Sequence, residues 1–260
     1  MSFLNGNLRF GELVSGRGFK GLLRSELRLL MREPMLVFWA LFFPVGLLVV
    51  LGVSSDKPLK SLGGLKLIQV ETPILMMFTL TTLCLSAMPS TLAGYRDKGY
   101  LKRLSTTPIG AVRLLSAQLV LILGLAAGLI VILTLVAHFA FNVQLPQEFP
   151  SFVLTVLLVA VAMAAIGLFV SAVASTQRVA GAVGSVLFFP MMFFAGLWVP
   201  QQQMGEVLRH ISQYTPLGAA VPAIENSFAG SWAGSNHLLV LLAYGFIFGR
   251  LSIRFFRWEK

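Results

Sequence analysis

Residues 114–147 read LLSAQLVLILGLAAGLIVILTLVAHFAFNVQLPQ and hold no Asp, Glu, Lys or Arg. A helix needs roughly 20 apolar residues to cross about 30 Å of hydrocarbon, so this stretch is long enough to span a bilayer. Five further uncharged windows reach that length: 34–55, 72–95, 149–177, 179–205 and 226–249. The sequence therefore predicts an all-α integral membrane protein with six transmembrane helices.

The composition of the whole chain agrees with this fold class. Hydrophobic residues make up 57% of the 260 residues and charged residues only 12%, whereas soluble domains use roughly a quarter of their residues as charges. The one cysteine, Cys84, lies inside the second window, which excludes an intrachain disulfide. We expect an interfacial N-terminal segment over residues 1–34 and a single six-span domain over residues 35–260.

The basic residues indicate how the chain is oriented in the membrane. Sixteen of the 20 Lys and Arg residues fall in residues 1–33, in the segment between the second and third windows, at Arg178 or in the C-terminal tail. Basic residues favour the cytoplasmic side, so we expect both termini inside, although three lysines between residues 57 and 66 go against the rule. This charge is topogenic, and the net charge of +10 does not indicate a nucleic-acid partner.

Two segments predict helices that do not span. Residues 19–33 (FKGLLRSELRLLMRE) alternate leucines with basic residues four apart, which is typical of an amphipathic elbow helix on the inner leaflet, and Pro34 should break it before the first span. A plain cytoplasmic helix is the alternative. Between the fifth and sixth windows, Gln203–Tyr214 and Leu217–Phe228 are too short to cross, and we interpret them as outer re-entrant or interfacial helices.

Enzymatic machinery is almost absent from the sequence. No G-x-x-x-x-G-K-[ST] motif occurs, so the chain has no P-loop for ATP. His138, His210 and His237 are scattered and stand at no metal-ligand spacing, which predicts no metal site. An intramembrane hydrolase would need Ser185 beside His138 or His237, but small residues near Ser185 are typical of helix packing. No charge lies at the centre of a predicted span, which argues against an ion-driven carrier.

The segment from Gly94 to Val120, GYRDKGYLKRLSTTPIGAVRLLSAQLV, is the most informative inner stretch. It combines dense charges of both signs with Leu101 and Leu104 on one face of a short predicted helix. A solvated topogenic loop and a coupling helix that docks into a soluble partner both fit this pattern.

Three motifs in register resemble the membrane subunits of type-2 ABC exporters, the group of the daunorubicin-export permeases. That family's loop runs acidic-x-G-T-L-x-R-L-x-x-T-P, and here Asp97 replaces the usual Glu and Tyr100 the usual Thr, while the other motif residues match: Gly99, Leu101, Arg103, Leu104, Thr107 and Pro108. The stretches SVLFFPMMFFAGLWVP (185–200) and YTPLGAAVPAIE (214–225) resemble its late signature. The stretch LLRSELRLLMREPMLVFWALFFP (22–44) resembles its elbow and first span.

The resemblance implies a permease subunit in the cell membrane of a prokaryote, not itself an enzyme. Two such subunits, identical or paralogous, would pair with two cytoplasmic ATPase subunits that bind ATP and Mg, so that this chain itself holds no cofactor. It further implies contact of the elbow with the ATPases through Glu26 and Glu33. The implied coupling residues are Arg96, Asp97, Lys98, Gly99, Tyr100, Leu101, Lys102, Arg103 and Leu104.

Met and aromatic side chains in the second and fifth spans suggest the cargo. Flexible Met and aromatic surfaces suit varied apolar ligands, although packing or lipid contact is an equal alternative for each side chain. We expect export of an amphipathic drug, antibiotic or lipid, with polysaccharide or glycolipid export as the second possibility and a non-transporting scaffold as a third. The substrate path would be lined by Met77, Phe78, Phe188, Phe189, Met192 and Phe193.

Overall fold

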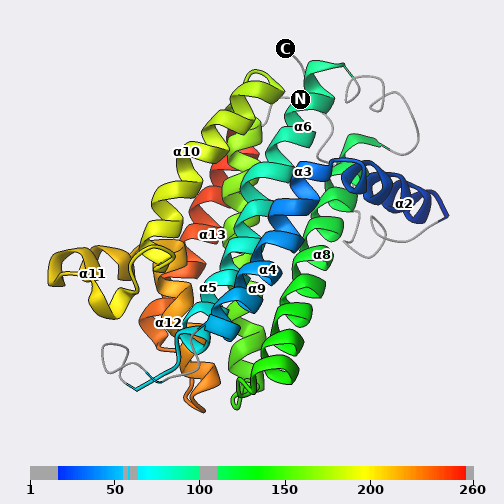
Figure 1. Cartoon of the computed structure of the whole chain (residues 1–260). Coiled ribbons are helices and arrows are strands. Elements are labelled where there is room, and N and C mark those ends of the chain that lie inside the picture. Colours follow the sequence, from blue (N-terminus) through cyan, green and yellow to red (C-terminus); the bar gives the residue numbers. More distant parts are fainter. Residues whose placement is uncertain (1–16, 55–57, 59–63, 100–109, 256–260) are drawn as a thin grey trace.

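The computed structural model describes residues 17–54, 58, 64–99 and 110–255, and these residues form helices and no strands (Figure 1). Six helical runs are long and apolar enough to cross a membrane, as predicted. The elements are α2 (Arg17–Met31), α3 (Pro34–Val37), η1 (Phe38–Phe42), α4 (Phe43–Ser54), α5 (Leu67–Thr82), η3 (Leu83–Ala87), α6 (Met88–Asp97), α8 (Gly110–Phe141), α9 (Phe149–Val173), α10 (Gln177–Ala195), η4 (Gln201–Gln203), α11 (Glu206–Gln213), α12 (Pro216–Phe228) and α13 (Ser235–Phe255).

The first span is built from α3, η1 and α4, and the second from α5, η3 and α6. The elbow helix α2 ends at Met31, and Pro34 opens the next helix at its first position. Proline suits that position because its missing N–H has no intrahelical acceptor there. The predicted break between elbow and first span is therefore confirmed. Figure 1 shows α2 projecting sideways from the bundle, across the run of the spans.

The second span occupies the centre of the bundle. In its most apolar window 83% of the residues are buried, whereas the other five spans reach at most 56%. The fourth span, α9, packs beside it and also against α13 and α12. In the first, third, fifth and sixth spans less than a third of the window is buried, which suits helices that face lipid or a further subunit. The core is thus one central helix inside a ring of partly exposed ones.

A π-helical turn, η3, interrupts the second span at mid-height. Two glycines approach it closely, because a Cβ at Gly167 of α9 would collide with the Cys84 carbonyl oxygen and one at Gly184 of α10 with that of Leu85. Small residues let transmembrane helix backbones come this near. A π turn bends a helix, and here it directly precedes α6, which has Pro89 in its first turn. The glycines and the π turn hold α9 and α10 against the central span.

The segment between the fifth and sixth spans folds as two short helices, in agreement with the prediction. α12 is buried along most of its length and packs on α9, α13 and α10, whereas α11 projects from the bundle (Figure 1). The exposed Val207, Leu208 and Ile211 give α11 an apolar face. Ser212 Oγ donates a hydrogen bond to the Phe194 carbonyl at 2.8 Å, which fixes α11 to the end of α10. α12 therefore re-enters the bundle, and α11 lies beside it.

We expect Gly184→Ala to destabilise the protein by about 1–3 kcal/mol, because the added methyl group overpacks the contact with the Leu85 carbonyl. Gly128→Ala in α8 is the matched control, since a Cβ there meets nothing within 4 Å. Thermal unfolding in detergent measures both. A Gly184→Ala melting temperature equal to that of Gly128→Ala would contradict the close-contact account.

Candidate functional site

The cytoplasm-facing end predicted for the second span contacts the elbow helix through one hydrogen-bonded pair. Tyr95 Oη in α6 donates to the carboxylate of Glu26 in α2, 2.8 Å from each oxygen. Glu26 is only 4% exposed. Burial raises the pKa of this carboxyl, and the hydrogen bond from Tyr95 partly offsets that rise. Leu22 of α2 and Tyr95 also pack on Leu114 of α8.

The next residue, Arg96, joins the same end to the fourth span. Its guanidinium donates to the carbonyl oxygens of Ala172, at 3.1 Å, and of Ala174. These carbonyls lie at the C-terminal end of α9, where the helix dipole favours a positive charge. Ala93 of α6 packs against Ala174 and Ala180, and Ala180 lies at the start of α10. One turn of α6 therefore contacts α2, α9 and α10, and we call residues 93–96 with Glu26 the inner junction.

The predicted coupling residues begin at this junction. Arg96, Asp97, Lys98 and Gly99 lie at or just after the end of α6, with Asp97 and Lys98 exposed. Gly99 has φ 65°, a left-handed conformation that glycine adopts without strain. Tyr100–Leu104 lie outside the described residues, so their role as a coupling helix stays a prediction. The predicted ATPase contact of the elbow also stays a prediction; Glu33 is exposed, whereas Glu26 contacts Tyr95 of this chain.

The predicted path residues fall into two groups. Met77 and Met192 are fully buried and pack in the core. Phe78 contacts Phe43 of α4 at 5.1 Å and Phe188 of α10 at 5.3 Å between ring centroids, so an aromatic row crosses from the first span to the fifth. Phe189 continues the row outward, 59% exposed, and stacks on Trp198. Phe193 is half-buried beside Phe194. Their role as path residues stays a prediction.

Two carboxylates were not among the predicted site residues. Glu71 lies in α5 at 7% exposure and has no hydrogen-bond partner among the described residues. Glu225 of α12 borders a cavity of about 200 Å³ with Gln69, Gln144 and Asn226. Burial raises the pKa of Glu225 to about 7, and a hydrogen bond from Gln202 partly offsets that rise. The predicted windows are bounded by charged residues, so the second window begins only after Glu71. The signal in the sequence that the helix starts earlier is the absence of a helix breaker between Leu67 and Thr72.

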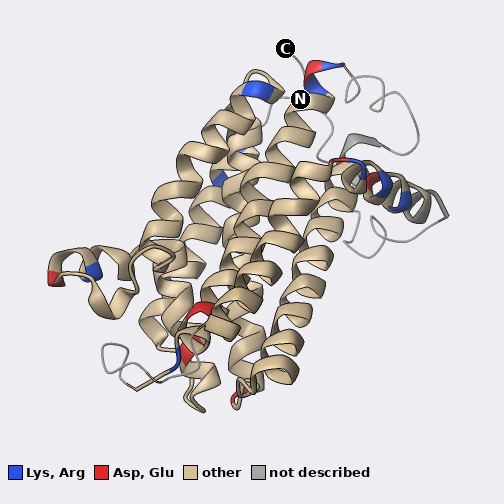
Figure 2. Ribbon diagram, in the orientation of Figure 1, with Lys and Arg blue, Asp and Glu red and all other residues tan. Residues whose placement is uncertain are grey.

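Charges lie mainly at the two ends of the bundle and on α2 and α11 (Figure 2). Ser185 Oγ donates to the Gly181 carbonyl of its own helix, and His138 Nδ1 lies 2.9 Å from the Val143 carbonyl beyond the end of α8. The described residues thus bring no histidine to Ser185. They also contain no group of three His, Cys, Asp or Glu side chains that could hold a metal ion.

The model of a known protein family matches most of the chain. The family described as ABC-2 type transporter matches residues 17–228, from the start of α2 to the end of α12. The match therefore includes the elbow, the inner junction, the first five spans and both short outer helices. No curated protein matches the chain.

We expect Tyr95→Phe to lower the stability of the protein by about 1–3 kcal/mol, because a buried carboxylate loses its donor. Tyr214→Phe is the matched control, since that side chain is 61% exposed. The two melting temperatures in detergent provide the comparison. Equal values for the two variants would show that the Tyr95 hydroxyl contributes nothing to the inner junction.

Proposed function

This chain belongs to the ABC-2 type transporter family, and we propose that it is the permease subunit of an ATP-driven exporter. ABC-2 membrane subunits conduct transport, and we infer that ATP and Mg bind in separate cytoplasmic ATPase subunits. The observation that carries the proposal is the inner junction, because a segment of mixed charge leaves the central span directly after a turn that contacts α2, α9 and α10. We place the chain in the cell membrane of a prokaryote with both termini inside.

The inner junction offers a route by which an ATPase could move the permease. A force applied after Asp97 acts on α6, which is continuous with the buried second span. Tyr95 carries that movement to the elbow, and Arg96 carries it to the end of α9. Packed elements with discrete arrangements can convert such a displacement into a change at the far end of a bundle. We therefore propose that residues 96–104 receive the ATPase.

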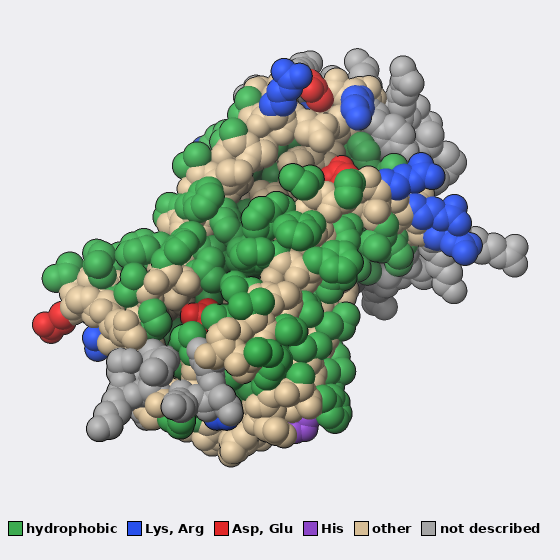
Figure 3. Space-filling model, viewed as in Figure 1, with side chains coloured by type: hydrophobic (Ala, Val, Ile, Leu, Met, Phe, Trp, Pro, Cys, Tyr) green, Lys and Arg blue, Asp and Glu red, His purple; other side chains and the backbone are tan. Residues whose placement is uncertain are grey.

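We propose that the export path lies between two copies of this permease, next to the first and fifth spans. Only 17% and 22% of their apolar windows are buried, and both spans contribute to the aromatic row, whereas the sixth span, 11% buried, does not. Figure 3 shows a largely hydrophobic face between the charged ends of the molecule. The aromatic row from Phe43 to Phe189 lies across these spans and supports a path beside α10.

An amphipathic drug, antibiotic or lipid is the cargo that we propose. Its apolar part would contact aromatic side chains such as Phe188 and Phe189. The carboxylates of Glu71 and Glu225 lie on α5 and α12, two helices that pack against each other. In their ionised form these carboxylates disfavour an anionic headgroup more than a neutral or cationic one.

We expect the double variant Leu101→Asp with Leu104→Asp to lose its ATPase partner, because the charges would remove the apolar face of the predicted coupling helix. Co-expression with the ATPase, affinity purification through the permease, and ATP hydrolysis by the complex measure the loss. Leu145→Asp, an exposed site beyond the end of α8, is the control and should keep the partner. Retention of ATPase and transport by the double variant would contradict the docking proposal.

We expect Phe189→Cys to form a disulfide between two copies upon oxidation, because α10 would face its counterpart. Phe246→Cys on α13, similarly exposed at 69%, should stay monomeric on a non-reducing gel. The parent chain adds a second control, since its only cysteine, Cys84, is buried. A Phe189→Cys chain that remains uncrosslinked, or crosslinks no more than Phe246→Cys, would contradict pairing of identical copies along α10.

A further inference from the structure

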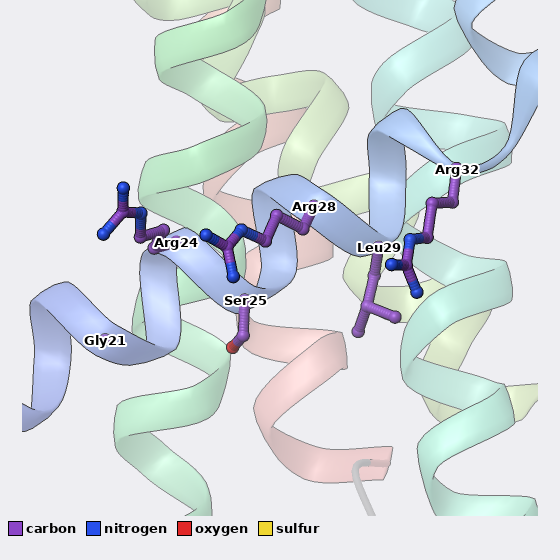
Figure 4. Close-up of a pocket in the computed structure, with 6 residues that line it drawn as sticks. All are labelled: Gly21, Arg24, Ser25, Arg28, Leu29 and Arg32. Atoms are coloured by element: carbon purple, nitrogen blue, oxygen red, sulfur yellow. The ribbon is translucent and has the colours of Figure 1, made fainter.

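The elbow helix carries a basic hollow on its outer side (Figure 4). Arg24 and Arg28 of α2 and Arg32, which directly follows α2, recur every four residues and therefore lie along one side. Together with Gly21, Ser25 and Leu29 they line a hollow of about 340 Å³. Figure 4 shows the three guanidinium groups along the same side of the helix, with Ser25 and Leu29 next to them.

The opposite side of α2 is fixed against the bundle. Glu26 is buried there and hydrogen-bonded to Tyr95 of the second span. Positions two apart on a helix point in nearly opposite directions, so Arg24 and Arg28, which flank Glu26, point away from the protein. The hydrogen bond at Glu26 thus determines where the basic face is presented.

Among the residues that the structure describes, the three arginines have no anionic partner. All three are exposed, and none has a hydrogen bond or ion pair to any described residue. Like charges four residues apart repel each other, so their shared face is stabilised by an external anion. The Ser25 hydroxyl already donates to the Leu22 carbonyl at 2.8 Å, which leaves the guanidinium groups as the donors to a ligand.

The position of α2 places this face at the membrane surface. α2 ends at Met31, and the first candidate span begins at Pro34. Arg32 therefore lies within a few residues of the point where the chain enters hydrocarbon. Leu29 and Met31 are 50% and 56% exposed, which provides apolar contacts next to the charges. A basic face bordered by exposed apolar side chains matches a phospholipid, with its anionic headgroup and acyl chains.

We propose that Arg24, Arg28 and Arg32 bind the headgroup of an anionic phospholipid. Guanidinium groups bind phosphate through paired N–H donors, which an ammonium group cannot reproduce. The proposal goes beyond the transport function, because it requires neither an ATPase nor a cargo. A lipid held here would sit two residues from Glu26, whose bond to Tyr95 forms part of the inner junction.

The test is native mass spectrometry of the purified full-length chain in detergent, titrated with phosphatidylglycerol or phosphatidylcholine. We expect phosphatidylglycerol to bind more tightly than phosphatidylcholine. The variant R24Q/R28Q/R32Q should weaken phosphatidylglycerol binding tenfold or more, since each basic residue near a membrane surface contributes a factor of about 5. The variant R24K/R28K/R32K keeps the charge and should lose about threefold, because paired donation is lost.

The matched control is R178Q/R250Q/R254Q, which removes three exposed arginines elsewhere in the chain. It should bind phosphatidylglycerol within twofold of the parent. Melting temperatures without lipid check that each variant is folded, and the lysine variant preserves the test if the glutamine variant is unstable.

Four results would overturn the proposal. The first is that the glutamine and lysine variants bind phosphatidylglycerol like the parent, and the second is that the control loses as much binding as the glutamine variant. The third is that the parent shows no preference for phosphatidylglycerol over phosphatidylcholine. The fourth is displacement of phosphatidylglycerol by millimolar inorganic phosphate, which would indicate a site for free phosphate. If the glutamine variant instead binds phosphatidylglycerol normally but fails to purify with the ATPase, the face is a protein-docking surface.

Discussion

The contact between the π-helical turn of the second span and the two glycines beside it sets the spacing of the bundle. Gly167 and Gly184 let α9 and α10 reach the backbone of the central helix. In a membrane no hydrophobic force distinguishes helix from lipid, so close packing of this kind supplies much of the association. The outer ring of spans then takes its position from the central helix, and the inner and outer ends of that helix become the places where other elements meet.

The two ends differ chemically. At the inner junction, one turn of α6 uses an aromatic hydroxyl, a guanidinium and an alanine to contact three helices. At the outer end, α12 re-enters the bundle, and the carboxylate of Glu225 on α12 borders a small cavity. A helix that is rigidly packed between these two ends is suited to carry a displacement from a cytoplasmic ATPase to the outer half of a permease.

The elbow helix has two faces with separate tasks. Glu26 binds Tyr95 on the bundle side, and the three arginines, for which we propose an anionic phospholipid, lie on the other side. The sequence pattern does not separate Glu26 from the three arginines, because all of them are charged residues on an amphipathic helix. Because Glu26 is buried against this chain, the structure connects the elbow to the central span directly, and the ATPase contact predicted for Glu26 stays a prediction.

The sequence by itself determined the six spans, the elbow and the two short outer helices, because uncharged length and helical periodicity are local properties of a chain in a bilayer. It also predicted a membrane subunit of the ABC-2 transporter family, and the match to residues 17–228 confirms that family. Only the tertiary structure decided which span is central, that Met77 and Met192 are buried in the core, and that Arg96 caps α9. It also brought Glu71 into a helix. These features depend on contacts between segments far apart in the chain, and no local pattern encodes them.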